Sequence, residues 1–176
     1  MQILNFAEEF SSKIPALTLL TTLGYEFIPP SQCNAMRSSK LLVDQANANK
    51  TTNQVVLLPI MRAFLAKQTF TFEGQAHHLS DSAIDKIMRE LNPAMNLGLQ
   101  AANEALYNAM LYGVTVTEFI DGKKTSQTIA LIDWNNIGNN SFHVTEELVV
   151  LNSEGTSSRR PDIVCFVNGL PLAVIE

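Results

Sequence analysis

The fold of this chain is decided by its closing stretch, residues 161–176, which reads PDIVCFVNGLPLAVIE. Two apolar runs meet at Asn168-Gly169, and an Asn-Gly dipeptide between such runs indicates a β-hairpin. Asp162 begins the first run and Glu176 ends the second. Because a carboxylate is costly to bury without a partner, these two acids are the first candidates for a functional role.

The length of the turn decides whether the two acids meet. With a two-residue turn, the numbers of paired residues sum to 337, and Asp162 lies opposite Ile175. With a three-residue turn, or a bulge of the same effect, they sum to 338, and Asp162 lies opposite Glu176 with Cβ atoms about 5 Å apart. Carboxylates that close repel each other unless a cation lies between them, and oxygen ligands suit Mg²⁺. We therefore expect the odd-length turn or the equivalent bulge. On spacing alone, the alternative is a strand-end Asp162 and a solvated Glu176.

The residues before this hairpin also have the two-residue period of strands. VTVTEFI (114–120) and SQTIALID (126–133) flank the turn DGKK and predict a second hairpin. FHVTEELVVL (142–151) predicts a further strand, and SEGTSSRR (153–160) a polar loop.

The first half of the chain has the period of helices instead. Gly24 and Gly113 each follow such a pattern and are expected to end a helix. The polar stretch 29–53 predicts a long loop or a partly ordered segment, and 69–80 predicts a connector. Apolar spacing of three or four predicts helices over 3–23, 54–66, 83–91 and 95–112.

Two helix starts carry their own signals. Pro15 either kinks the first helix or starts a second one capped by Ser11 or Ser12. Ser82 with Asp85 three residues later resembles a capping box.

This order of elements predicts an α+β fold, α/β/α-like, with a mixed and largely antiparallel central sheet flanked by helices. The 176 residues fit one domain, with a helical part at about 1–112 and a sheet part at about 114–176.

Composition excludes several classes of protein. The apolar content of 46 % can form a core, and no apolar run is long enough for a membrane span. The start MQILNFAEEF lacks the basic, then apolar, pattern of a signal peptide, so we expect a cytoplasmic protein. A net charge of −5 argues against a freestanding nucleic-acid binder, since the phosphate backbone requires a basic surface. If the chain acts on DNA, another part must deliver the DNA.

The last residues, RRPDIVCFVNGLPLAVIE, resemble the signature of the N-terminal nuclease domain in the R (restriction) subunit of type I restriction–modification enzymes. This family is a branch of the PD-(D/E)xK nuclease superfamily. The resemblance lies in Pro161-Asp162, in the Asn-Gly-x-Pro at 168–171 and in Glu176. It is strong over about 83–176, fair over 1–28 and weak over 29–80. It implies a restriction-endonuclease-like fold.

The resemblance also implies a Mg²⁺-dependent deoxyribonuclease site. Asp162 and Glu176 would be catalytic carboxylates that bind the metal, assisted by a first-helix acid, Glu9 or its neighbour Glu8. The family's catalytic Lys follows the Glu by two residues, which puts it on the same strand face. This sequence stops at Glu176, before that position.

We therefore expect a fragment of a longer bacterial or archaeal chain, with little or no cleavage by itself. The resemblance implies double-stranded DNA as substrate, and motor domains of the same parent chain that use ATP to translocate DNA. It also implies methyltransferase and specificity subunits as partners. The competing hypothesis is a non-catalytic docking or assembly module with a nuclease-like fold. A third, a standalone resolvase or repair nuclease, predicts a basic surface, which the charge opposes.

Several other residues have a functional and a structural interpretation. Arg159 and Arg160, beside Asp162, could face DNA or belong to a polar loop. Trp134 could stack on a base, although an anchor for its loop is favoured. The remaining candidates, Glu146, Glu147, His77, His78, His143 and Cys165, are interpreted as solvent-facing or structural, with Glu146 or Glu147 kept as an alternative third ligand.

Overall fold

A computed structural model describes residues 12–37, 54–91, 98–152 and 155–176. The chain divides into two compact units, one formed by 1–57 with 141–176 and the other by 58–140. The first unit contains α2 (Ile14–Thr22), β1 (Glu26–Phe27), α3 (Pro30–Arg37), β6 (Phe142–Glu146), β7 (Val150–Leu151), β8 (Ser158–Arg159), β9 (Ile163–Val167) and β10 (Leu170–Ile175). The second contains α4 (Leu58–Lys67), β2 (Thr69–Phe72), β3 (Gln75–His78), α5 (Asp81–Glu90), α6 (Leu99–Tyr112), β4 (Val114–Ile120), β5 (Lys123–Ile129) and a short 3₁₀ helix (Ile137–Asn139).

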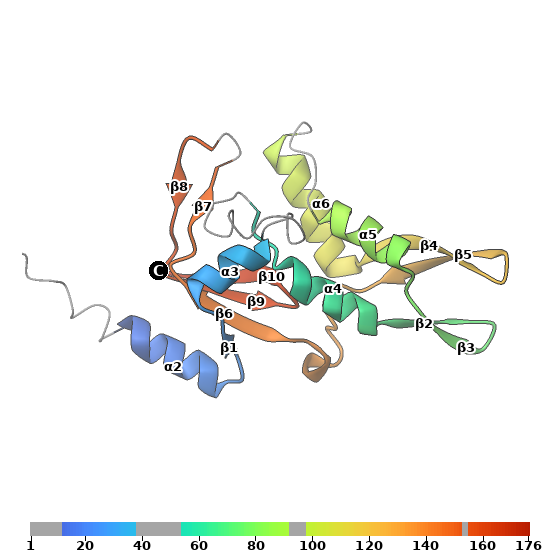
Figure 1. Ribbon diagram of the computed structural model, residues 1–176, viewed down its shortest axis with the longest axis horizontal. Coiled ribbons are helices and arrows are strands. Elements are labelled where there is room, and N and C mark those ends of the chain that lie inside the picture. Colours follow the sequence, from blue (N-terminus) through green and yellow to red (C-terminus); the bar gives the residue numbers. More distant parts are fainter. Residues whose placement is uncertain (1–11, 38–53, 92–97, 153–154) are drawn as a thin grey trace, which may run out of the picture. The chain divides into compact units, whose positions relative to one another are not determined.

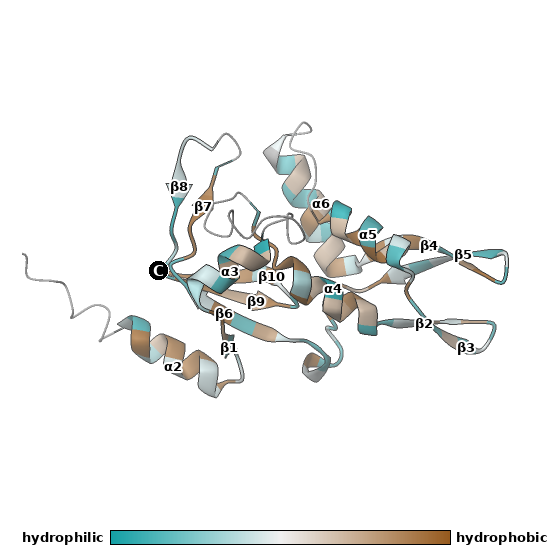
Figure 2. Cartoon of the chain, viewed as in Figure 1, coloured by the Kyte–Doolittle hydropathy of each residue, from teal (hydrophilic) through white to brown (hydrophobic). Residues whose placement is uncertain are grey.

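The first unit is built on a four-stranded mixed sheet in the order β1-β6-β9-β10 (Figure 1). β1 runs parallel to β6, whereas β6–β9 and β9–β10 are antiparallel. β9 lies between two neighbours, and all five of its residues are buried. The run of brown along β9 in Figure 2 reflects its apolar side chains. The predicted mixed α+β architecture is confirmed.

The hairpin predicted at Asn168-Gly169 is present as β9–β10. Both turn residues have positive φ, 52° and 84°, which is the conformation of a type I′ turn and suits Asn followed by Gly. Asn168 is fully buried, and its Oδ1 accepts a hydrogen bond from the backbone N–H of Ser141 at 2.9 Å. The carbonyl of Gly169 accepts another from the N–H of Leu57 at 2.8 Å. Each residue of the turn is therefore fixed by a hydrogen bond to another part of the first unit.

Helices cover both faces of this sheet. Val144, Ile163 and Cys165 form a buried cluster against which residues of α2 pack. The neighbouring Thr145 points to the other face, where it interacts with the Cys33 thiol of α3. Because side chains alternate along a strand, α2 and α3 lie on opposite faces, which gives three layers.

Helix α3 shows that the start of the stretch 29–53 is ordered, which agrees with the alternative of a partly ordered segment and not with a loop throughout. Residues 30–37 are helical, and 38–53 lie outside the described residues. The apolar pattern of this helix is poor, but Cys33 and Arg37, one turn apart, are both fully buried. Tertiary burial rather than amphipathic spacing therefore stabilises it.

The start of α2 differs from the prediction in its cap. Lys13 flanks the first turn in a helical conformation, without a side-chain cap, and Pro15 lies in that turn. The N-cap position of α2 is thus Lys13 rather than Ser12, and Ser11 lies outside the described residues. At the other end, Gly24 follows the C-cap Leu23 with φ +99°, as predicted.

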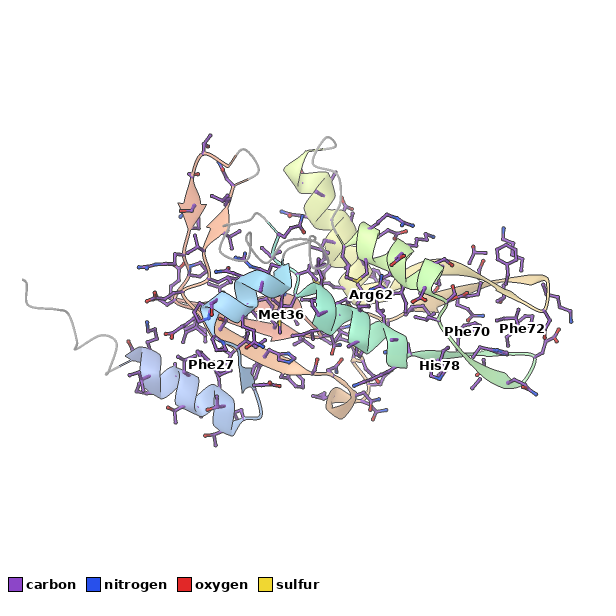
Figure 3. The ribbon with its side chains drawn as sticks, in the orientation of Figure 1. Phe27, Met36, Arg62, Phe70, Phe72 and His78 are labelled. Atoms are coloured by element: carbon purple, nitrogen blue, oxygen red, sulfur yellow. The ribbon has the colours of Figure 1, made fainter. Side chains whose placement is uncertain are left out.

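The second unit contains two hairpins that form separate two-stranded sheets, β2–β3 and β4–β5. The first corrects the prediction of a connector over 69–80, because Glu73 and Gly74 take positive φ and form the turn. Phe70, Phe72 and His78 lie along this hairpin in Figure 3. The second hairpin was predicted, but it does not join the central sheet among the described strands.

Helix α5 begins two residues earlier than its predicted capping box. Ser80, not Ser82, is the N-cap, and its hydroxyl accepts a hydrogen bond from the N–H of Ala83 at 3.2 Å. Arg62 of α4 forms ion pairs with Asp81 and Asp85 of α5 (Figure 3). These contacts join the two helices on their exposed sides.

None of the helices in the part of the chain that the structure covers is long and apolar enough to cross a membrane.

Candidate functional site

The register of β9–β10 follows the bulge alternative. Next to the turn, Leu170 pairs with Val167, as a two-residue turn requires. The register then shifts between Pro171 and Ala173, so that Ile175 pairs with Ile163 at the end of the hairpin. β9 begins at Ile163 and β10 ends at Ile175; continued by one residue on each strand, this register would place Asp162 opposite Glu176.

Both acids are accessible to solvent, as are the last four residues of β10, whereas all of β9 is buried. Asp162 and Glu176 are exposed, whereas Ile163 is 2 % exposed. The carbonyl of Asp162 accepts a hydrogen bond from the N–H of Glu147 at 2.9 Å, which continues the pairing of β6 with β9 beyond Ile163. The backbone of Asp162 is thus held by a neighbouring strand while its side chain is available for a ligand.

A group of four charged side chains lies beside Asp162. Lys13 Nζ is 3.0 Å from Glu147 Oε1 and 3.2 Å from Glu146 Oε2. Arg160 is 3.4 Å from Glu147 Oε2. The hydrogen bond between Lys13 and Glu147 raises the pKa of the Lys13 ammonium and lowers the pKa of the Glu147 carboxyl. Both groups are therefore charged at neutral pH, and the interpretation of Glu146 and Glu147 as merely solvent-facing is incomplete.

The other predicted site residues are distributed differently. Glu8 and Glu9 lie outside the described residues. Arg159 belongs to β8, where it pairs with Val150 and is exposed. Trp134 is 56 % exposed, and its Nε1 donates to the carbonyl of Met110 at 3.3 Å. This hydrogen bond matches the favoured interpretation of a loop anchor.

The donor set at the hairpin end fits Mg²⁺ better than a transition metal. No group of three or more His, Cys, Asp or Glu residues that could hold a metal ion occurs within the described ranges. Mg²⁺ does not require such a group, since proteins commonly bind it through one or two carboxylates together with water and substrate phosphates. Two exposed carboxylates at facing strand positions meet that requirement.

Arg37 is a buried charge that the sequence pattern did not reveal. Its side chain is fully buried and donates to the carbonyls of Gln54 and Val149, each at 2.8 Å, and to Asn34 Oδ1. Burial lowers the pKa of its guanidinium. These contacts connect α3 with residue 54 and with the segment after β6, so its role is structural.

His143 gives a prediction for the dependence of stability on pH. Its side chain is 8 % exposed, and burial lowers its pKa below 6.5, although Glu26 at 3.7 Å acts in the opposite direction. As pH falls through 6.5, the unfolded chain binds a proton before the folded chain does, so stability present above this pH is lost below it. We expect the urea midpoint to fall between about pH 7.5 and about pH 5.5, and to fall less in His143→Gln.

The control for this experiment is His78→Gln, because His78 is exposed. It should retain the wild-type pH dependence. An equal fall in His143→Gln and wild type would contradict the assignment to His143.

The fold defines a class: a mixed α+β domain whose closing hairpin, β9–β10, is flanked by the exposed acids Asp162 and Glu176. The sequence profile of the type I restriction enzyme R protein N terminus matches residues 5–176. The chain therefore belongs to this family.

Two curated relatives agree with that membership. The chain is 33 % identical over 98 residues to the type I restriction enzyme HindI endonuclease subunit of Haemophilus influenzae, covering 56 % of this chain and 9 % of the relative. It is 29 % identical over 99 residues to the putative type I restriction enzyme MjaIXP endonuclease subunit of Methanocaldococcus jannaschii, covering 56 % of this chain and 10 % of the relative. The matched part is thus about a tenth of each relative.

Proposed function

We propose that this chain is the DNA endonuclease domain of a type I restriction enzyme R subunit and that it hydrolyses phosphodiester bonds with Mg²⁺. The observation that supports the proposal is the bulged register of β9–β10, which pairs Ile175 with Ile163 and, continued by one residue, would bring Asp162 opposite Glu176. The names of the two curated relatives, both endonuclease subunits, support the same activity.

Asp162 and Glu176 would hold the metal ion. When bound there, Mg²⁺ polarises a phosphoryl oxygen and lowers the pKa of a coordinated water. The two carboxylates fix where the scissile phosphate sits relative to the hairpin end. Glu9, or Glu8, is proposed as the assisting acid from the N-terminal segment. Arg159 is the better candidate for a DNA phosphate contact, because Arg160 already interacts with Glu147.

The proposed setting follows from the type of enzyme. Double-stranded DNA is the substrate, and methyltransferase and specificity subunits are the partners. ATP-driven translocation belongs to motor domains outside this chain. The proposed location is the cytoplasm of a bacterium or archaeon. The net charge of −5 is compatible with a domain to which other parts deliver the DNA.

Plasmid cleavage tests this function directly. The protein is expressed from its native gene, with any residues encoded beyond Glu176, together with its partner subunits, and is incubated with plasmid, ATP and Mg²⁺. We expect nicking that EDTA abolishes, and a loss of at least about 100-fold in Asp162→Ala, since even residues that only support metal ligands cost about 10–100-fold when changed.

The matched control is Glu104→Gln, which removes one exposed carboxylate from α6 in the other unit. It should cleave like wild type. A folded Asp162→Ala variant that nicks at the wild-type rate contradicts the proposed site. A folded, assembled wild type that never nicks favours the docking module instead.

A further inference from the structure

The four charged side chains beside Asp162 have an arrangement that a regular strand could not produce. Successive side chains of a strand point to opposite faces, so neighbouring glutamates should not reach one ammonium. Glu146 and Glu147 both contact Lys13, at 3.2 and 3.0 Å. This is achieved because β6 ends at Glu146 and Glu147 takes φ +48°.

A left-handed backbone is unfavourable for a residue with a side chain, and such outliers gather at functional sites. Partly exposed ion pairs stabilise a fold only slightly, and the side chain of Glu147 is 42 % exposed. Stability alone is therefore a poor explanation for the conformation of Glu147.

Glu147 makes two contacts with the segment that carries Asp162. Its backbone N–H donates to the carbonyl of Asp162 at 2.9 Å. Its Oε2 contacts Arg160, two residues before Asp162, at 3.4 Å. Its Oε1 contacts Lys13, at the start of α2. One residue thus joins the first helix to both sides of Pro161.

We propose that Glu147, held by Lys13 and Arg160, is a positioning residue that fixes Asp162 for metal binding. We call Lys13, Glu147 and Arg160 the Glu147 clamp. The inference rests on the proposed function, in which Asp162 is a metal ligand. The clamp does not touch the metal; it limits the movement of the chain from Arg160 to Asp162, so that the Asp162 carboxylate is held in place for the metal.

The test measures Mg²⁺ affinity by calorimetry on the subunit expressed from its native gene, with wild type and Asp162→Ala defining the signal of this site. Residues that orient metal ligands typically change affinity by about 10–100-fold. We expect Glu147→Gln and Lys13→Met each to raise the Kd for Mg²⁺ at least about tenfold, and Lys13→Arg to restore most of the affinity.

Glu147→Gly separates positioning from stability. Glycine adopts positive φ without strain, so this variant should unfold at the same or a higher urea concentration than wild type. It lacks the clamp carboxylate, so its Mg²⁺ affinity should still fall. The matched control is Lys86→Met, which breaks an exposed ion pair with Glu90 on α5 and should leave affinity unchanged.

Nicking of plasmid is measured on the same samples. If the wild-type protein binds Mg²⁺ through Asp162 but never nicks plasmid, the proposed function is refuted. The role of the Glu147 clamp is still tested in that case, by the Mg²⁺ affinities of its variants. Affinities within about twofold of wild type in Glu147→Gly, Glu147→Gln and Lys13→Met, against the 10–100-fold expected, overturn the clamp alone. Unchanged Mg²⁺ binding in Asp162→Ala overturns both.

Discussion

Phe166→Ala is expected to lower the free energy of unfolding by about 3–5 kcal/mol, the usual cost of truncating a fully buried phenylalanine. Phe166 is 0 % exposed and lies on β9, between His143 of β6 and Pro171 of β10. Its removal leaves a cavity at β9, one of the two inner strands of the four-stranded sheet. The measurement is urea denaturation followed by circular dichroism.

Phe119→Ala is the matched control, because Phe119 of β4 is 67 % exposed. Surface truncations of this kind usually change stability by no more than about 0.5 kcal/mol. Similar losses in the two variants would mean that Phe166 does not anchor the sheet.

Gly113→Ala is the second large effect, with an expected loss of about 2–6 kcal/mol from left-handed strain together with overpacking. Gly113 joins α6 to β4 with φ +82°. A Cβ at this position would lie 2.4 Å from the carbonyl oxygen of Ile129 and 2.9 Å from its carbonyl carbon. Both contacts are with backbone atoms of the paired strand, so no side-chain rotation can relieve them. Thermal or urea unfolding of the variant measures the loss.

Gly122→Ala separates the cost of the positive φ from the cost of overpacking. Gly122 lies in the turn at the other end of the same hairpin with φ +78°, and a Cβ there would meet no atom within 4 Å. It should therefore lose only the conformational part, about 1–2 kcal/mol. Equal losses in the two variants would indicate that the β4–β5 pairing yields to the added methyl group.

The sequence was sufficient to predict those parts of the fold in which the backbone conformation depends on one or two residues. Asn168-Gly169 predicted the central hairpin because both residues tolerate positive φ. Gly24 predicted the end of the first described helix for the same reason. The bulge in β9–β10 was also among the predicted alternatives, once repulsion between carboxylates was used to choose the register, while the facing of the two acids stays a prediction.

Long-range contacts explain what the sequence did not reveal. Helix α3 has little apolar pattern and depends on burying Cys33 and Arg37. The β2–β3 hairpin was missed because Glu73, rather than Asn or Asp, takes the positive φ of its turn. The contact between Lys13 and Glu147 joins residues 134 positions apart, and no local pattern encodes such a pair.

The bulge between Pro171 and Ala173 has a consequence for how this region can evolve. Deleting the extra residue there, Leu172, would remove the bulge but keep every other pair, so Asp162 and Glu176 would keep their relative register. Loss of the bulge by this deletion should therefore be tolerated in active homologues, whereas a single-residue insertion or deletion between Ala173 and Glu176 would shift Glu176 relative to Asp162 and should be rejected.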